Sequence, residues 1–433
     1  QSFTNNPNNT PTLTVNTGEY DSLIGRSYYE VAAEGRSQHK TQEMGTLELR
    51  GKFTSGMRLL ENLGKKNDKE TGVFDGLDTS IKGIASLTNN REEPFAKKLA
   101  ELQETAELAL KSYDVFAPEK LIPILAKGYK QAVDAEWSTR NPDSKKFLQQ
   151  KETEFAKALQ MAAGVVVDAL SDTDTIVAGA STNVAVRVFA PDKTDLKVKN
   201  VTLKVPNGWT SNSSTEPTQQ ENAFRPRREA AFNSSFFTVV SNPNAKPTQP
   251  YWLESPRNKN FTFDWSADDA AKNQPFQPSL ITAELKLEIG GQEIPVEREV
   301  QYRYSDEIRG EIRRDLNVVP AATVGLESNL LIAPISAKPS KHRLVMTVTN
   351  NSTKEIKGTA KFNLPSGWTL APNSGDFALR SKGEKTALAF ELTIPANVKP
   401  NSYKLTAAAT VEGKDYDWQM QTIAYPHVQT HRL

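Results

Sequence analysis

Hydrophobic positions follow different patterns on either side of about residue 173. Before it, apolar residues recur at steps of three and four, the spacing of one face of an amphipathic helix. After it, apolar and polar residues alternate, which is typical of half-buried β-strands. Val184, Val186 and Val188, for example, are separated by Ala185 and Arg187. The patterns predict a multidomain α + β fold, with a helical bundle followed by two antiparallel, immunoglobulin-like β-sandwiches.

The helical part contains three long amphipathic runs, at residues 95–110, 121–137 and 147–170. Pro142, with Asn141 or Asp143 beside it, predicts the start of the third run. Helices that each bury one stripe and are joined by short turns pack as an antiparallel bundle. The stripes are aliphatic and carry no paired Glu-x-x-His, so a di-metal site in the bundle is not expected.

An internal repeat supports two sandwiches. The string Val205-Pro206-Asn207-Gly208-Trp209-Thr210 matches Leu364-Pro365-Ser366-Gly367-Trp368-Thr369 at an offset of 159 residues (368 minus 209). Each string follows an alternating strand. A tryptophan repeated at the same turn in two sandwiches is best interpreted as a buried plug between sheets, and we predict this for Trp209 and Trp368. The alternative for Trp368 is stacking on a sugar ring.

Near the start of the chain, residues 25–45 (GRSYYEVAAEGRSQHKTQEMG) gather reactive side chains. No proline interrupts the stretch from Arg26 to Gln42, so a helix is predicted there. One stripe of this helix would carry Tyr28, Arg36 and His39 or Lys40, where a core helix would carry leucine. A solvated surface helix is the alternative, and the residues alone do not decide between the two.

Composition limits the possible functions. The 433 residues, 37% of them hydrophobic and 24% charged, are ordinary for globular protein of two to four domains. A net charge of +1 predicts no nucleic-acid partner. Without cysteine there is no disulfide and no thiolate zinc site. No apolar run is long enough to predict a membrane span, and the start QSFTNNPNNT, without methionine or signal peptide, indicates a mature or cut chain.

Candidate metal and hydrolase motifs are weak. The histidines His427 and His431 have metal-ligand spacing if helical, but Pro426 precedes them and no carboxylate is near. No metal site is therefore predicted. The sequence contains no G-x-S-x-G motif and no distinct pair of carboxylates. A peptidase or a glycosidase is therefore not predicted.

The string from Glu34 to Gln42, E-G-R-S-x-H-K-x-Q, closely resembles the end of the catalytic domain of large bacterial PIG-L-type (LmbE-like) N-acetylglucosaminyl deacetylases. Two more elements support the resemblance, the P-Y-W-L string at 250–253 and the D-x-x-R-G-E string at 306–311. The second sandwich resembles NEW-type accessory domains of carbohydrate-active enzymes. That resemblance rests on Pro365-Gly367-Trp368, Gly383-Glu384 and Pro400-Tyr403-Leu405.

The resemblance implies a division into five parts: 1–60 as the tail end of a deacetylase-like catalytic domain, 61–172 as the helical bundle, 173–305 as the first sandwich with an insertion at 211–279, 306–425 as the second, and 426–433 as an extension. The family is zinc-dependent, but its A-H-P-D-D motif is absent from this chain. No catalytic residue and no cofactor are therefore expected here, and zinc belongs to the missing catalytic portion. The chain would be inactive alone.

The expected partners are an N-terminal deacetylase catalytic domain and a glycan, in a periplasmic or extracellular location. Candidates for substrate contact lie in the N-terminal segment: Tyr28, Arg36, Ser37, His39, Lys40 and Gln42. Tyr251 and Trp252 are candidates for stacking on sugar rings, or else they face the catalytic domain. The alternative to a deacetylase accessory portion is a non-catalytic carbohydrate-binding or scaffold protein of the cell envelope.

Overall fold

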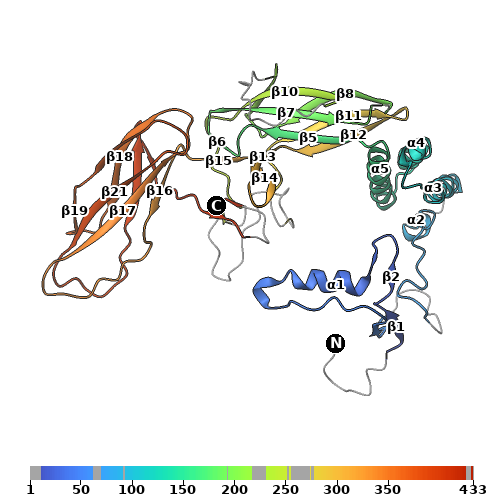
Figure 1. Ribbon diagram of the computed structural model, residues 1–433, viewed down its shortest axis with the longest axis horizontal. Coiled ribbons are helices and arrows are strands. Elements are labelled where there is room, and N and C mark those ends of the chain that lie inside the picture. Colours follow the sequence, from blue (N-terminus) through green and yellow to red (C-terminus); the bar gives the residue numbers. More distant parts are fainter. Residues whose placement is uncertain are drawn as a thin grey trace. The chain divides into compact units, whose positions relative to one another are not determined.

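The computed structural model describes residues 11–61, 70–90, 93–192, 194–216, 231–250, 253–254, 274, 277–425 and 431–432. The described chain is mostly β-sheet with some helices (Figure 1). It divides into two compact units. The first unit comprises Gln1–Lys111 and Lys127–Thr153, and the second comprises Ser112–Ala126 and Glu154–Leu433.

The N-terminal segment of the first unit consists of small elements. Strand β1 (Leu13–Asn16) pairs with β4 (Thr54–Met57), and β2 (Tyr20–Asp21) pairs with β3 (Arg26–Ser27). Helix α1 (Tyr28–Ser37) follows directly. Few side chains here are buried, so the segment has little core of its own.

A capping box sets the start of α1. The Ser27 hydroxyl accepts a hydrogen bond from the Glu30 amide, and the Glu30 carboxylate accepts one from the Ser27 amide. Arg50 also binds this carboxylate, and these hydrogen bonds hold the pKa of Glu30 at about 2.

The helix predicted to reach Gln42 ends at Ser37. The Ser37 hydroxyl donates to the Ala33 carbonyl and accepts from the Thr46 amide, which ties the helix end to the following loop. Lys40 to Gln42 form a separate 3-10 turn. Those residues therefore do not continue the stripe of α1.

A short helix, α2 (Ile84–Leu87), comes next, followed by three long ones: α3 (Glu93–Lys111), α4 (Ile122–Trp137) and α5 (Pro142–Ala162), with a 3-10 turn at Pro118–Leu121. Each long helix buries one stripe, as α3 does with Phe95, Leu99 and Leu102. The Asn141 side chain caps α5 by accepting from the Ser144 amide. Because α4 and α5 each contribute residues to both units, the predicted bundle is not confirmed.

The third predicted helical run ends earlier than its periodicity indicated. Gly164 has a φ of +66°, its amide donates to the Met161 carbonyl, and the Val165 amide donates to Gln160. This glycine-ended arrangement terminates α5. Residues Val166–Ser171 form strand β5 instead of a last helical turn.

The first pair of sandwich-like sheets comprises a six-stranded sheet, β14-β13-β5-β7-β10-β9, and a three-stranded sheet, β12-β11-β8, in the described part of the chain. Alternate residues of the central strands are buried, as the period of two predicted. The strands are β7 (Ser181–Phe189), β8 (Leu196–Lys204), β9 (Thr210–Ser214), β10 (Asn233–Val240), β11 (Thr282–Ile289), β12 (Gln292–Glu299), β13 (Gln301–Asp306) and β14 (Gly310–Asp315).

This sheet pair extends beyond the predicted limits of 173–305. Strand β5 pairs with β7 and β13, and β14 pairs with β13. The D-x-x-R-G-E string at 306–311 contains the turn between β13 and β14. There the Asp306 carboxylate accepts the Ile308 and Arg309 amides, and Gly310 has a φ of +78°.

The second pair has the sheet orders β16-β17-β21-β19 and β20-β18-β22-β23. One buried cluster draws Met346 and Phe390 from the first sheet and Phe377 and Ala409 from the second, so this pair is sandwich-like. Its strands are β16 (Ala322–Leu326), β17 (Ser340–Asn350), β18 (Ile356–Asn363), β19 (Thr369–Ala371), β20 (Gly375–Leu379), β21 (Lys385–Ile394), β22 (Thr406–Val411) and β23 (Lys414–Tyr416). Strands β6 (Thr175–Val177) and β15 (Asn317–Val319) pair in parallel, and β24 (Thr422–Ile423) pairs with β25 (His431–Arg432).

Candidate functional site

The repeated Pro-x-Gly-Trp turn has the same backbone in both sheet pairs. Gly208 and Gly367 have φ values of +77° and +83°, in the left-handed region that favours glycine. The Trp209 amide donates to the Pro206 carbonyl at 3.1 Å, and the Trp368 amide donates to its proline at 3.2 Å. The sequence repeat therefore encodes a repeated local structure.

The surroundings of the two tryptophans differ. Trp209 is 8% exposed and acts as a buried plug, as predicted. Trp368 is only half-buried: it packs against the core of its sheet pair and also lines a groove. The prediction of a buried plug is wrong for Trp368.

The groove has a volume of about 410 Å³ and lies at one end of the second sheet pair. Its walls come from the loop after β16, the first residues of β17 and the loop between β21 and β22. Both apolar and polar residues line it. Residues that line it include Leu330, Leu331, Ile335, Phe362, Trp368, Lys399, Asn401 and Tyr403.

Main-chain hydrogen bonds fix the loops that form the groove. The Glu327 amide donates to the Val345 carbonyl at 3.2 Å, and the Asn397 amide donates to the Ser336 carbonyl at 2.8 Å. The Tyr403 hydroxyl donates to the Lys399 carbonyl at 3.0 Å. The groove is therefore held open by the fold before any ligand binds.

Two neighbouring aromatic rings line the groove. The ring centroids of Trp368 and Tyr403 are 5.2 Å apart with their planes tilted by 45°. Tyr403 is 37% exposed, so part of its ring is open to a ligand. Aromatic faces beside amide and ammonium groups can bind a molecule that has both C–H faces and hydroxyl groups.

The sequence pointed to this groove only in part. Trp368 and Tyr403 were recognised as elements of a NEW-type domain, but the loop after β16 was missed. Its string Leu330-Leu331-Ile332-Ala333-Pro334-Ile335 is apolar without strand alternation, and Ile332 is 81% exposed. An apolar run in a loop is the signal that could have been used.

In the N-terminal segment, two of the predicted contact residues have structural partners. The Tyr28 hydroxyl donates to the Asp21 carboxylate at 2.9 Å, which raises the pKa of Tyr28. The hydrogen bond from the Leu23 amide, followed by the one from the Tyr28 hydroxyl, lowers the pKa of Asp21. Ser37 is held by the loop bonds described above.

The other predicted contact residues lie on exposed surface. His39 places its Nδ1 3.2 Å from the Arg36 carbonyl oxygen. The side chains of Arg36, Lys40 and Gln42 are exposed and form no hydrogen bond with the described residues. Substrate contact by these residues stays a prediction.

The sugar-stacking candidates Tyr251 and Trp252 lie outside the described residues, as do His427 and the side chain of His431. In the described part of the chain, no group of three or more His, Asp or Glu side chains is placed to hold a metal ion. The donor set described here therefore does not fit zinc. No helix of the described residues is long and apolar enough to cross a membrane.

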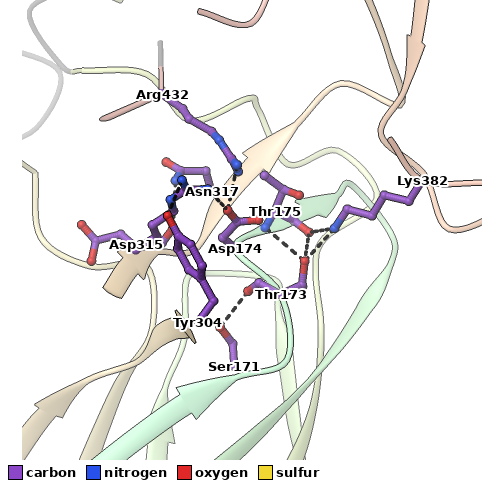
Figure 2. Close-up of polar contacts among 10 residues, drawn as sticks. Ser171, Thr173, Asp174, Thr175, Tyr304, Asp315, Asn317, Lys382 and Arg432 are labelled. Carbon is purple, nitrogen blue, oxygen red and sulfur yellow. Dashed lines mark hydrogen bonds and ion pairs between the residues drawn. The ribbon is translucent and has the colours of Figure 1, made fainter. Parts of the chain in front are cut away.

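A polar cluster connects the second sheet pair to the first (Figure 2). The Asp174 carboxylate binds Arg314 at 3.2 Å and Arg432 at 2.8 Å. The Lys382 ammonium, from the turn before β21, donates to the Thr173 hydroxyl at 2.6 Å and to the Thr175 carbonyl at 2.8 Å.

The charges of Asp174, Arg314 and Arg432 are paired with one another, whereas the Lys382 ammonium binds neutral oxygens. Burial would raise the pKa of Asp174, but the bonds to Arg432 and Arg314 outweigh it and the pKa is lowered. Burial lowers the pKa of Lys382. The Lys382 bonds therefore link the turn before β21 to Thr173 and Thr175.

Comparison with known proteins identifies one segment. Residues 338–412 match the family described as NPCBM-associated, NEW3 domain of alpha-galactosidase. The match includes both Trp368 and Tyr403. No curated protein matches the chain, and these comparisons provide no support for a PIG-L-type deacetylase.

Solved structures similar to parts of the chain include the adhesin FdeC of Escherichia coli, with 13% identity, 57% of this chain and 60% of that chain covered, and a TM-score of 0.19. The Yersinia pseudotuberculosis adhesin InvE has 12% identity and a TM-score of 0.15, with 58% of this chain and 58% of that chain covered. A DUF4785 family protein of Legionella pneumophila has 14% identity and a TM-score of 0.18, with 59% of this chain and 56% of that chain covered. The chain thus spans about three fifths of the length of these structures, and TM-scores this low support no inference.

Proposed function

We propose that this chain is a non-catalytic accessory portion of a carbohydrate-active or cell-envelope protein, and that its groove binds a sugar. One observation carries the proposal: the Trp368–Tyr403 pair lines a preformed groove within the segment that matches a NEW3 domain. A domain of that family accompanies alpha-galactosidase, a carbohydrate-active enzyme, by its description.

The chemistry of the groove supports a saccharide ligand. A pyranose ring has an apolar C–H face that packs on an aromatic ring, and hydroxyl groups at its edge. Asn401 and Ser402 lie along the groove and offer amide and hydroxyl partners for those groups. Lys399 adds a donor at the same edge. A periplasmic or extracellular location is part of the proposal.

Isothermal titration with oligosaccharides of galactose, glucose and N-acetylglucosamine tests the proposal. Trp368→Ala should lower the affinity of the sugar that binds at least tenfold, because it removes the larger ring of the pair. Trp418→Ala is a matched control, since Trp418 is also partly exposed but does not line this groove. Equal affinity of wild type and Trp368→Ala for every sugar would reject the site.

A second proposal concerns the N-terminal segment, residues 11–61. Leu23, Leu47 and Leu60 are 89%, 74% and 90% exposed, and a two-stranded sheet with a ten-residue helix is marginally stable alone. We propose that the segment docks on a further domain, the deacetylase catalytic domain predicted from the resemblance, and that Arg36, His39, Lys40 and Gln42 face its substrate.

Hydrogen exchange separates the docked from the free segment. In the complete polypeptide as its gene encodes it, amides of α1 should exchange at least tenfold more slowly than in this 433-residue chain. Equal exchange in both would contradict docking. Substituting His39→Ala in the complete polypeptide should lower deacetylase turnover without changing its unfolding temperature; unchanged turnover would remove the contact role.

A further inference from the structure

Helix α3 and the part of α4 that belongs to the first unit line a shallow hollow of about 330 Å³. Lys98 and Glu101 of α3 form one side. Gln131, Asp134 and Trp137 of α4, with Ser138 just after it, form the other. No binding role was predicted for these helices from the sequence.

Trp137 does not behave as the core residue that its place in the apolar stripe predicted. It is the last residue of α4 and is 79% exposed. The neighbouring residue Glu136 faces α5, where it pairs with Lys145 at 3.4 Å. The indole of Trp137 therefore leaves an apolar face open to solvent at the edge of the hollow, where a ligand can stack on it.

Polar groups in the hollow have unused hydrogen-bonding capacity. The Oε1 of Gln131 is buried and has no hydrogen-bond donor among the described residues. The terminal torsion of a glutamine amide is broad, so the Gln131 amide can rotate toward the hollow. The rotation would break no hydrogen bond of Oε1, because this oxygen has none with the described residues. The Glu101 carboxylate also has no partner in the described part of the chain.

Two further acceptors are held in place. The Lys98 ammonium donates to the Asp134 carbonyl at 3.0 Å, which links α3 to α4. The Asp134 carboxylate pairs with Lys130 at 2.5 Å, on the same helix. The hollow thus combines one exposed indole with acceptors supplied by an amide and two carboxylates.

We infer that this hollow is a saccharide-binding site, with a pyranose ring stacked on Trp137. A pyranose matches both parts of the site, since its C–H face covers the indole and its hydroxyl groups donate to Gln131 and Glu101. A planar aromatic ligand would cover the indole but offer few donors. The inference goes beyond the groove of the second unit and does not depend on it.

Fluorine NMR of the protein labelled with 5-fluorotryptophan tests the two sites separately. The chain has six tryptophans, and Trp137→Phe and Trp368→Phe variants assign their signals. Cellohexaose, chitohexaose and β-1,4-mannohexaose are the probes. At least one should shift the Trp137 signal, and Trp137→Ala should lower its affinity at least tenfold. Gln131→Leu, which removes the acceptor but keeps the size, should lower it about threefold.

Each outcome separates this inference from the groove proposal. A shift of the Trp368 signal alone supports the groove and overturns the inference. A shift of the Trp137 signal alone supports the hollow and leaves the groove without sugar binding. Trp418→Ala, at an exposed tryptophan outside the hollow, should leave the Trp137 shift unchanged. Unchanged affinity in Trp137→Ala would overturn the inference, because loss of an exposed side chain should not unfold the helix.

Discussion

The two sheet pairs contain the same turn, yet they use its tryptophan differently. The Trp209 ring is buried. A Cβ added at Gly208 would lie 2.3 Å from the Asn242 Nδ2, so Asn242 already fills the space beside this turn. At Gly367 nothing lies within 4 Å of such an atom. The first turn is closed by neighbouring chain, whereas the second opens onto a groove. A repeated motif can therefore keep its backbone and change its role.

The largest expected difference comes from removing each tryptophan. Trp209→Ala should destabilise the first sheet pair by about 3–5 kcal/mol, since it leaves a cavity in a packed core. Trp368→Ala should lower the free energy of unfolding of the second sheet pair by clearly less, because part of that ring already faces the groove. Urea unfolding followed by probes within each sheet pair measures both. Equal losses would mean that the two tryptophans are packed alike.

A smaller difference is expected for the glycines of the two turns. Gly367→Ala should lower the free energy of unfolding by about 1–2 kcal/mol, which is the strain of a left-handed conformation in a residue with a Cβ. Gly208→Ala should cost more, because its Cβ also meets the Asn242 amide. Asn242→Ala in the Gly208→Ala background checks the cause, since it should recover the excess but not the backbone strain.

The smallest effect is expected from pH. Lys197 and Lys199 bind Glu288 on β11 and hold its pKa at about 2, below its usual value. A carboxyl whose pKa is lowered by folding stabilises the fold above its unfolded pKa of about 4.3 and loses this contribution as the pH falls toward 2. The first sheet pair should therefore lose stability over that range.

A control variant isolates this contribution. Glu288→Gln should lower stability at pH 7 and flatten the dependence between pH 4.5 and 2, as followed by urea unfolding of the first sheet pair. An unchanged slope in Glu288→Gln would assign the acid sensitivity to other carboxyl groups of the first sheet pair, such as Asp306 on β13, whose pKa is lowered to about 2 by its bonds to Arg309.

Much of the strand-rich part could be predicted because its signal is local. The period of two at Val184, Val186 and Val188 places these residues on the buried face of β7. The helix-to-strand change was misplaced, since the run through Val166 has apolar spacing compatible with either element. Gly164 decides it by ending α5, and pairing with β7 then makes β5 a strand.

The candidate sites were harder to predict because they depend on exposure. The sequence marked Tyr28 and Ser37 as contact residues, but each has a nearby structural partner. It marked Trp137 and Trp368 as packing residues, and both are at least partly open. Periodicity identifies which residues share a face, but not whether another element covers that face.

By itself, the sequence determined the alternating strands, the repeated Pro-x-Gly-Trp turn and the absence of cysteine chemistry. These depend on a residue and its near neighbours. Only the tertiary structure decided that Asn242 closes one turn while the loop after β16 leaves a groove beside the other. The physical reason is that burial and hydrogen-bond satisfaction depend on segments far apart in the chain, and their meeting is encoded in no single local pattern.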